Sequence, residues 1–264
     1  MDHTHRESVE QKRVEEMNDN YRGKNVVITG GSSGIGFAAA ELLVNAGARV
    51  VITGRSRETL DAATERLGDN AFAVRGDVAS LIDLDSLAAS VRDHLGTVDA
   101  LFVNAGIASA TPLESVTEKE YDESFAVNVK GAFFTVQKIA PLLSPGAGVV
   151  LTTSAVNVVG MAETSVYAAG KAALRSLARS LSRELLPRGI RVNAVSPGPI
   201  DTGILGNTMS EEEVEQFMAE RVAENPMQRF GNPDEVAKAM VFLAFDATYT
   251  AGAEFVVDGG MTQL

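Results

Sequence analysis

The sequence predicts an α/β fold: a single domain in which a doubly wound, parallel, seven-stranded sheet carries helices on both faces. Apolar, β-branched runs alternate along the chain with segments of helical periodicity. The runs are continuously apolar, which is typical of strands buried on both faces of a parallel sheet. Right-handed crossovers between such strands place helices on both sides of the sheet. A chain of 264 residues is long enough to bury the core of one large domain.

The seven expected strands are short runs rich in Val, Ile, Leu and Phe, which suit a buried, pleated surface. The helical segments between them are rich in good helix formers such as Ala, Leu, Glu and Arg, and their apolar residues recur every three or four positions. The expected strands are 25–29, 49–53, 71–75, 100–103, 148–153, 190–195 and 254–257, and the expected helices are 34–46, 59–67, 84–95 and 165–186.

Two stretches depart from this rhythm. Residues 1–22 form a charged extension with marginal helical potential over 7–17, and we expect it to be disordered or loosely docked. The Rossmann-like domain then covers 23–264. Residues 201–230 form a long insertion with a helical pattern over 211–222, and because long excursions beside a site are often lids, we expect this one to cover the substrate.

The composition excludes several kinds of site and partner. The chain has no cysteine, so disulfides and thiol catalysis are excluded, and it has only three histidines, so we expect no metal site. A net charge of −12 argues against nucleic acid as a partner. No apolar run approaches the roughly 18 residues of a membrane span, and the first 22 residues do not form a signal peptide, so we expect a cytoplasmic protein without a membrane partner.

A candidate catalytic group consists of Ser154, Tyr167 and Lys171. Tyr167 and Lys171 lie four positions apart in the expected helix 165–186, so both can face the same side. A cation about 4 Å from the phenol contributes roughly 4 kcal/mol at an effective dielectric constant of about 20, which predicts a lowered pKa for Tyr167 even after some loss to desolvation. Such a phenol suits proton transfer to a carbonyl oxygen, which Ser154 can orient. Taken alone, this spacing is more often a pair of exposed helix residues.

A glycine-rich turn follows the first expected strand and precedes the first helix, as in a dinucleotide-binding βαβ unit. Glycines let the backbone approach a pyrophosphate, and the N-terminus of the next helix offers free N–H groups and a partial positive charge. The residues expected to form this phosphate site are Gly30, Ser32, Ser33, Gly34, Ile35 and Gly36.

With these motifs in order, residues 23–264 resemble the short-chain dehydrogenase/reductase family in its single-domain form. Thr29-Gly30-x-x-x-Gly34-x-Gly36 matches the family's cofactor turn. Val103 and Gly170 depart from the family pattern, which more often has Asn and Ser at these places. The other matching motifs are Asn104-Ala105-Gly106, Asn128, Ser154, Tyr167 with Lys171, Pro197-Gly198 with Thr202, 226–237, and Val257-Asp258-Gly259-Gly260.

The resemblance implies an oxidoreductase that moves a hydride between a nicotinamide cofactor and a ketone, aldehyde or secondary alcohol. In this family pattern Tyr167 donates the proton, Lys171 lowers its pKa and binds the nicotinamide ribose, and Asn128 bends its helix and holds a water that resupplies protons. A homotetramer is implied in the same way. Beyond the phosphate turn, the residues expected to contact the cofactor are Asp77, Val78, Asn104, Ala105, Gly106, Tyr167, Lys171, Pro197, Gly198, Ile200 and Thr202.

The substrate site is expected to be mostly apolar and to be formed by the loop after Ser154 and by the lid. An open alternative is that Phe217 and Met218 only pack the lid helix onto the body. The expected lining consists of Ala155, Asn157, Val159, Met161 and Ala162 from the loop and of Ile204, Leu205, Phe217 and Met218 from the lid.

The end of the second expected strand bears on the choice between NAD and NADP. An NAD site usually places Asp or Glu here to accept from the ribose 2′-hydroxyl, whereas an arginine accommodates a 2′-phosphate. This chain has Gly54 and then Arg55, with Arg57 two positions on. Because guanidinium groups suit phosphate, we expect NADP(H) to be preferred, with NAD(H) possible. The alternative is that both arginines are solvated helix-start residues, and Ser33 stands where some NADP-dependent relatives have a basic residue.

The favoured hypothesis is therefore an NADPH-dependent carbonyl reductase. Three alternatives stay open: an NAD-dependent alcohol dehydrogenase, an isomerase or dehydratase that uses the same groups, and a non-catalytic sensor that binds dinucleotide. Sensors of this fold typically lose the tyrosine or the lysine, and this chain has both. The substrate's identity does not follow, because the fold does not determine it.

Overall fold

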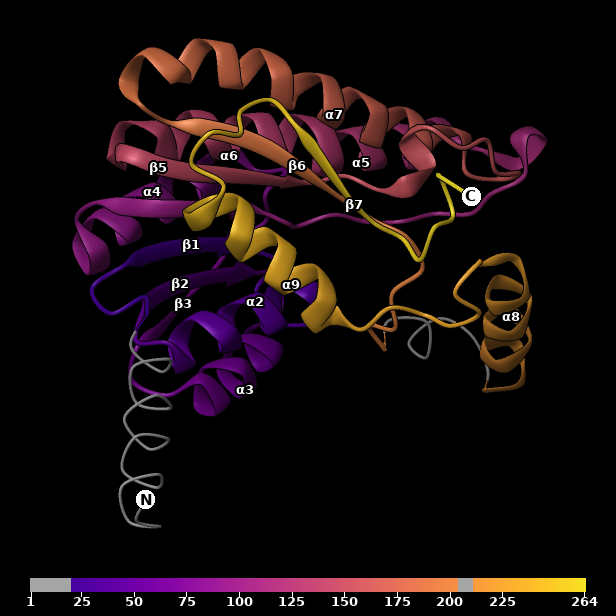
Figure 1. Ribbon diagram of the computed structural model, residues 1–264, viewed down its shortest axis with the longest axis horizontal. Coiled ribbons are helices and arrows are strands. Elements are labelled where there is room, and N and C mark those ends of the chain that lie inside the picture. Colours follow the sequence, from indigo (N-terminus) through magenta and orange to yellow (C-terminus); the bar gives the residue numbers. More distant parts are fainter. Residues whose placement is uncertain (1–19, 204–210) are drawn as a thin grey trace, which may run out of the picture.

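The computed structural model describes residues 20–203 and 211–264, and of residues 211, 213–215 and 217 only the backbone (Figure 1). Several expectations lie outside this part of the chain. They are the disorder of the N-terminal extension up to residue 19, its helix over 7–17, the lining residues Ile204 and Leu205, and the side chain of Phe217.

The seven strands pair in parallel in the order β3-β2-β1-β4-β5-β6-β7. The chain begins in the middle of the sheet, winds outward to β3, and returns past β1 to build the other half. The expected doubly wound fold is confirmed. The strands are β1 (Asn25–Thr29), β2 (Arg49–Gly54), β3 (Ala71–Arg75), β4 (Val98–Val103), β5 (Leu143–Thr152), β6 (Arg191–Pro197) and β7 (Glu254–Val257). The helices of more than one turn are α2 (Gly34–Asn45), α3 (Arg57–Leu67), α4 (Leu81–Leu95), α5 (Glu118–Phe125), α6 (Ala132–Ile139), α7 (Ser165–Leu185), α8 (Glu211–Glu224) and α9 (Pro233–Val241).

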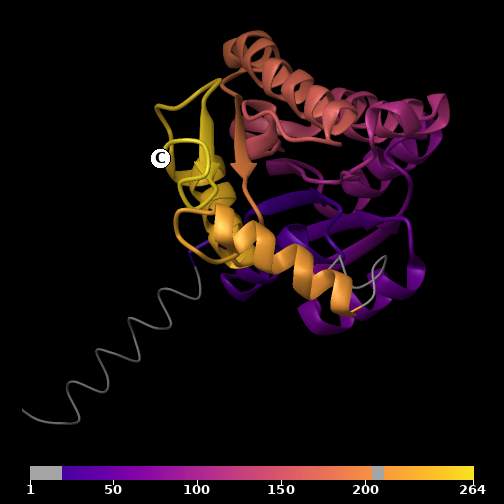
Figure 2. The ribbon, with the colours of Figure 1, turned by 90° about the vertical axis from the view of Figure 1, so that its right-hand side faces the viewer.

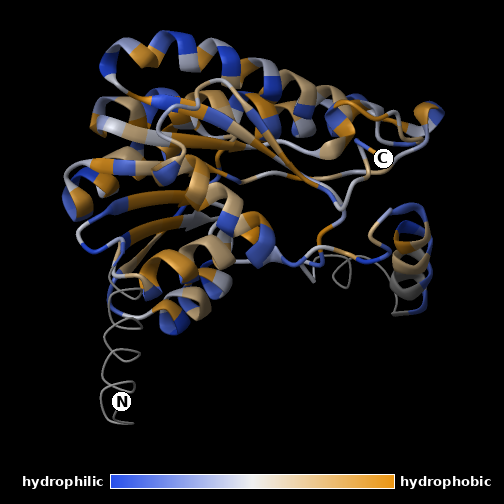
Figure 3. Ribbon diagram, in the orientation of Figure 1, coloured by the Kyte–Doolittle hydropathy of each residue, from blue (hydrophilic) through white to orange (hydrophobic). Residues whose placement is uncertain are grey.

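Two helical layers cover the sheet, with α2, α3 and α9 on one face and α4, α6 and α7 on the other (Figures 1 and 2). Successive strand residues alternate between the layers, because side chains of a strand point to opposite faces. Val26 and Ile28 pack with α2 and α9, whereas Val27 packs with the other layer. Figure 3 shows hydrophobic strands between helices whose outward sides are hydrophilic, as a doubly covered sheet requires.

Several boundaries differ from the sequence expectation because pairing between strands extends them. β4 begins at Val98 and β5 at Leu143, since these two residues pair before a register shift in the ladder. Helices α5, α6 and α9 were not among the expected helices. The start of α5 has a capping box in which Thr117 and Glu120 bond each other's backbone, a signal that the sequence did contain.

Tyr21 packs on the body and Arg22 lies beside Gly47, so the folded region starts before residue 23. The ring of Tyr21 lies 4.8 Å from that of Phe245, centroid to centroid. The backbone N–H of Tyr21 donates to the carbonyl of Ala46 at 2.9 Å. This aromatic contact adds apolar burial to the core layer of α2 and α9.

The insertion 201–230 leaves the sheet after β6, and its helix α8 stands apart from the two layers (Figures 1 and 2). Its ends meet, because Ile200 pairs with Gly231 and the N–H of Asp201 donates to the Gly231 carbonyl at 2.9 Å. After α8, the buried amide of Asn225 donates to the carbonyl of Asp258 at 2.8 Å. Both ends of the insertion are thus tied to the body. In the described part of the chain, no helix combines the length and apolar composition of a membrane span.

Candidate active site

Most of the residues singled out from the sequence lie at the carboxyl edge of the sheet, around the ends of β1, β4 and β5. β1 has β2 on one side and β4 on the other, so the chain order reverses between β1 and β4. In open α/β sheets, ligands bind in the crevice at this switch point. The site is therefore where the topology predicts it.

The glycine-rich turn after β1 has the shape that a pyrophosphate requires. Gly30 and Gly34 have φ values of 65° and 53°, which non-glycine residues rarely adopt. A Cβ on Gly36 would lie 2.2 Å from the Gly30 carbonyl oxygen, so only glycine lets α2 start this close to the turn. The first turn of α2 has no acidic residue, so nothing there opposes an anion. These residues fit the diphosphate of a dinucleotide.

Asn104 holds the turn in place from the end of β4. Its amide nitrogen donates to the carbonyls of Gly30 at 3.2 Å and Thr29 at 3.3 Å, and its amide oxygen accepts from the hydroxyl of Thr152 at 3.3 Å. The hydroxyl oxygen of Thr29 in turn accepts from the N–H groups of Asn104 and Ala105 at 3.0 and 3.1 Å. One side chain thus joins the ends of β1, β4 and β5, which supports a structural role beside the cofactor.

Lys171 is buried beneath this edge, with 4% of the residue exposed. Its Nζ donates to the carbonyl oxygen of Thr152 at 2.8 Å. Burial lowers the pKa of Lys171 to about 8, because desolvation disfavours the charged form. Gly106 makes room for this arrangement, since a Cβ there would lie 3.3 Å from Nζ and 2.9 Å from Oδ1 of Asn128.

Tyr167 lies one helical turn before Lys171, and Nζ of Lys171 is 5.6 Å from the centroid of its ring. Burial raises the pKa of Tyr167 above its ordinary value, and a hydrogen bond with Ser154 offsets part of the rise. The expectation that Lys171 lowers this pKa is therefore wrong. The ammonium of Lys171 donates to the Thr152 carbonyl, and desolvation of the buried phenol is the larger influence on the Tyr167 pKa, opposed by the hydrogen bond with Ser154.

Asn128 lies in a π-helical turn (Ala126–Gly131) that joins α5 to α6, so the helix is irregular at this residue. Its amide forms a pair of hydrogen bonds with the backbone of Ile107, accepting from the N–H at 3.0 Å and donating to the carbonyl at 2.9 Å. It also donates to the hydroxyl of Ser124 at 3.3 Å. The side chain therefore holds the chain just after Gly106.

The loop after β2 carries two arginines that were expected to lie near the cofactor ribose. Arg55 and Arg57 are exposed, and Arg57 begins α3. Nε of Arg75 donates to the carbonyl of Arg55 at 3.0 Å, which fixes the backbone there. The hydroxyl of Thr59 donates to that of Ser32 at 3.3 Å, so the glycine turn and the start of α3 are in contact.

The other expected cofactor residues lie along the same edge. The carboxylate of Asp77 accepts from the N–H of Ala79 at 2.9 Å, and Val78 is buried. Thr202 stands beside the glycine turn, since a Cβ on Gly34 would lie 3.2 Å from its side chain. Pro197 ends β6, and the loop from there to Thr202 contains Gly198 and Ile200.

The expected substrate residues are only partly available. Asn157 directs its amide nitrogen to Glu254 at 2.6 Å and to Ser196 at 3.2 Å instead of toward a substrate, because these acceptors lie behind the loop. Ala155 is 2% exposed and so offers almost no surface. Met161 is half-buried, and Leu205 lies outside the described residues.

The sequence did not single out Ile107 and Thr152, which help to hold the site together, and it gave Thr29 only as part of the glycine-turn motif. Thr29 acts partly through its hydroxyl. Ile107 binds Asn128 through its backbone, and Thr152 binds Lys171 through its backbone carbonyl. Backbone groups are common to every residue, so no side-chain pattern could have identified them. Their positions at a strand end or beside a matched motif were the only available signal.

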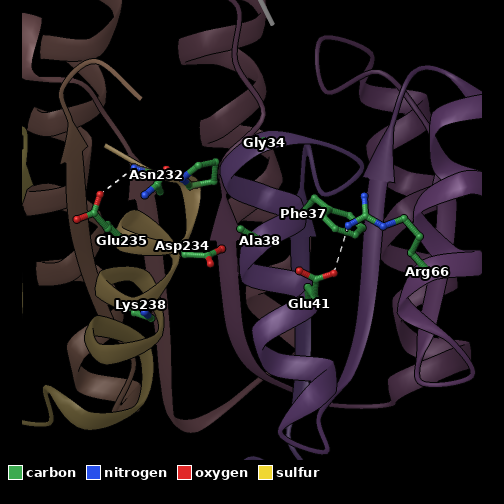
Figure 4. Close-up of a pocket in the computed structure, with 10 residues that line it drawn as sticks. Gly34, Phe37, Ala38, Glu41, Arg66, Asn232, Asp234, Glu235 and Lys238 are labelled. Carbon is green, nitrogen blue, oxygen red and sulfur yellow. Dashed lines mark hydrogen bonds and ion pairs between the residues drawn. The ribbon is translucent and has the colours of Figure 1, made fainter. Parts of the chain in front are cut away.

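A separate surface hollow of about 460 Å³ lies between α2 and α9 (Figure 4). The guanidinium of Arg66 lies 4.2 Å from the centroid of the Phe37 ring and 3.3 Å from a carboxylate oxygen of Glu41. Of the expected cofactor residues, the hollow includes only Gly34. Within the hollow Arg66 pairs with Glu41, while Glu235 pairs with Arg229 outside it, and we assign the hollow no role in the site.

Comparison with known proteins identifies the family. Residues 30–262 match a family model described as enoyl-(acyl carrier protein) reductase. The crystal structure of a short-chain dehydrogenase/reductase, glucose/ribitol dehydrogenase, from Brucella melitensis superposes with a TM-score of 0.87 at 31% identity, covering 94% of this chain and all of the other. This chain belongs to the short-chain dehydrogenase/reductase family. It is therefore an oxidoreductase of the class that acts on alcohols or carbonyls with a nicotinamide dinucleotide.

This short-chain dehydrogenase/reductase matches several curated relatives over nearly the whole length of both chains. An oxidoreductase of Sarocladium schorii is 43% identical over 245 residues, which are 92% of this chain and 97% of that protein. An L-rhamnose 1-dehydrogenase (NAD(P)(+)) of Azotobacter vinelandii is 39% identical over 250 residues, 90% of this chain and 96% of the relative. Versicolorin reductase 1 of Aspergillus parasiticus is 34% identical over 262 residues, 92% and 99% of the two chains. These named substrates differ, so family membership leaves the substrate open.

Proposed function

We propose that this short-chain dehydrogenase/reductase reduces a carbonyl compound to an alcohol with NADPH. The observation that carries the proposal is that Tyr167 and Lys171 lie on one helix beside Ser154, next to a glycine turn shaped for a dinucleotide. All four residues of the family's catalytic pattern are present, and Gly106 lies against two of them, Asn128 and Lys171. A sensor that binds dinucleotide would need the glycine turn but neither Tyr167 nor Lys171.

Each residue has a distinct part in the proposed reduction. When bound, the nicotinamide supplies the hydride for the carbonyl carbon. Tyr167 donates a proton to the carbonyl oxygen as the general acid. Its raised pKa means that the phenol holds this proton at neutral pH before the transfer. Ser154 orients the same oxygen by a hydrogen bond. Lys171, whose Nζ lies 5.6 Å from the centroid of the phenol ring, binds the nicotinamide ribose in this proposal.

Support for NADPH comes from the loop after β2. Arg55 is exposed, its backbone is held by Arg75, and the strand end itself is a glycine without a carboxylate. A 2′-phosphate can therefore accept charge-assisted hydrogen bonds from Arg55 without meeting an acidic side chain at the strand end. The hydroxyl of Ser32, which contacts Thr59, is a further neutral donor beside the turn.

We further propose that the substrate is uncharged and largely apolar. The loops 107–116 and 155–164 and the insertion 201–230 contain many acidic residues but only two basic ones, Arg221 and Arg229. Each arginine is paired, Arg221 with Glu224 at 2.9 Å and Arg229 with Glu235 at 2.7 Å. An anionic substrate would meet net negative charge there, and the cost grows as the charges lose water.

The experiment is a screen of ketones, aldehydes and secondary alcohols with both dinucleotides. The absorbance of the reduced nicotinamide measures turnover. Para-substituted aryl methyl ketones that carry a carboxylate, a methyl ester or a trimethylammonium group form a matched series for charge. We expect turnover with NADPH and poorest catalytic efficiency for the carboxylate. Cofactor binding without turnover of any compound would instead support the sensor. Best activity on the carboxylate would refute the uncharged substrate.

We also propose assembly into a homotetramer. β7 is the last strand of the sheet, and Phe242 and Phe255 near it are 44% and 43% exposed with their rings 6.1 Å apart. On the opposite layer, a hollow of about 560 Å³ on α5, α6 and α7 is lined by Phe125, Phe133 and Phe134, among others. Two separate apolar faces suit two kinds of contact between copies, as a tetramer needs. Light scattering that shows a monomer would refute this.

A further inference from the structure

A cluster of polar side chains with little exposure lies behind the proposed active site, centred on Glu254, the first residue of β7. The Glu254 side chain is 17% exposed and that of Arg175 is 16% exposed. One carboxylate oxygen, Oε1, accepts from the hydroxyl of Ser196 and from Nδ2 of Asn157, the latter at 2.6 Å. The other, Oε2, accepts from Nε of Arg175 at 2.9 Å. The hydrogen bonds from these three groups hold the pKa of Glu254 below its usual value in spite of burial.

On the Oε1 side, the cluster encloses the backbone of the catalytic serine. Thr153, directly before Ser154, shares a short hydrogen bond with the hydroxyl of Ser196. Asn157 ends the helical turn that Ser154 caps. The segment that carries the Ser154 hydroxyl is therefore held at both ends by groups that bind Ser196, and Ser196 and Asn157 both bind Glu254.

On the Oε2 side, the cluster holds the catalytic helix α7. Arg175 lies four residues after Lys171 and eight after Tyr167, so the three share one face of the helix. Its guanidinium binds Glu254 through Nε and the carbonyl of Gly252 at 3.1 Å through Nη1. Arg175 thus ties α7 to the strand that also holds the serine segment.

We propose that Glu254 is a positioning residue for the reduction, setting the distance between the hydroxyl of Ser154 and the phenol of Tyr167. This inference rests on the proposed function of the same site. In the described cluster, the two carboxylate oxygens of Glu254 join the serine segment and α7, and charge-assisted hydrogen bonds are the shortest and strongest kind available. Misplacing a reacting group by about 1 Å can cost about 10²-fold in rate.

The first test is a double-mutant cycle between Glu254→Gln and Ser154→Ala. In the wild-type background, Glu254→Gln should lower kcat by about 10- to 100-fold and leave the Kd for NADPH unchanged. In the Ser154→Ala background it should lower kcat no further, because no hydroxyl remains to be positioned. The control is Asp85→Asn, which breaks the ion pair between Asp85 on α4 and Lys138 on α6, far from the site. It should change kcat in neither background. Equal losses by Glu254→Gln in both backgrounds would overturn the proposal.

A second variant separates positioning from stability. Glu254→Leu with Arg175→Met removes both charges, and well-packed apolar replacements of a buried ion pair usually keep the fold stable. This double variant should remain folded but keep the lowered kcat, since Ser196 and Asn157 have lost their acceptor. Wild-type kcat in this variant would show that the pair only stabilises the fold.

A third measurement does not depend on turnover. With ¹³C at Cζ of tyrosine, the Tyr167 resonance is identified by its absence in Tyr167→Phe. Glu254→Gln should move it in the same direction as Ser154→Ala, because both weaken the hydrogen bond between Ser154 and the phenol. An unmoved resonance would overturn the proposal. If the wild type reduces no carbonyl compound, the reductase function fails, and this resonance still decides whether Glu254 positions Ser154.

Discussion

Replacing Lys171 with methionine should abolish a gain in stability that the wild type shows at alkaline pH. Lys171 has an ordinary pKa of 10.5, and burial lowers it to about 8 in the folded chain. Between these two pH values the unfolded chain retains a proton that the folded chain has lost. The free energy of unfolding rises with pH wherever the unfolded state binds more protons. This contribution therefore starts near pH 8 and is complete near pH 10.5.

The magnitude follows from the difference between the two pKa values. One pKa unit corresponds to about 1.4 kcal/mol, so the lysine should add about 3 kcal/mol across this window. At neutral pH the free energies of unfolding of the wild type and Lys171→Met should differ by less than this amount. Methionine removes the cost of burying a charge, but it also leaves the Thr152 carbonyl without its partner, which costs about 1–3 kcal/mol.

The assay is urea unfolding of wild type and Lys171→Met at several pH values from about 7 to about 10, comparing the difference between the two proteins. All other titrating groups are shared, so their contributions cancel in the difference. Lys119→Met is the matched control, because Lys119 is exposed and its loss uncovers no buried charge. Parallel curves for wild type and Lys171→Met would refute the reasoning that burial dominates at this lysine.

Three further predictions concern the site and its support. Tyr167→Phe should lower kcat by about 10²- to 10⁴-fold with little change in NADPH affinity, because only the proton donor is lost; near-normal turnover would contradict its assignment. Arg55→Ala should lower kcat/KM for NADPH by about 10- to 100-fold, the value of one or two charge-assisted bonds, and leave NADH unaffected. The same loss with both cofactors would show that Arg55 does not bind the 2′-phosphate. Arg57→Ala is the control at a neighbouring arginine. Gly148→Ala should destabilise the fold by about 1–3 kcal/mol or more, because its Cβ would lie 2.3 Å from the carbonyl oxygen of Ala244, and an unchanged Tm would contradict the close packing of β5.

The sequence by itself determined the class of fold and the chemical groups of the site. Continuous apolar runs and a period of about 3.6 residues are local properties, so the seven strands and most of the large helices could be predicted from the sequence. Glycine in the turn after β1 is likewise a local requirement, and Gly30, Gly34 and Gly36 occupy backbone positions that other residues cannot. Ser154, Tyr167 and Lys171 could be named because reactive side chains are few and their spacing matched a known family pattern.

The tertiary structure alone decided the electrostatics and the support of the site. The spacing of Tyr167 and Lys171 predicted a lowered phenol pKa, but its sign depends on burial, which residues distant in sequence produce. Asn157 looked like a substrate residue, yet Glu254, nearly a hundred positions later, binds its amide. Helix and strand patterns arise between near neighbours, whereas desolvation and acceptor placement arise between elements brought together by folding. The sequence therefore identifies the reacting groups. Only the folded chain determines the protonation state of each group and the contacts that hold the group in place.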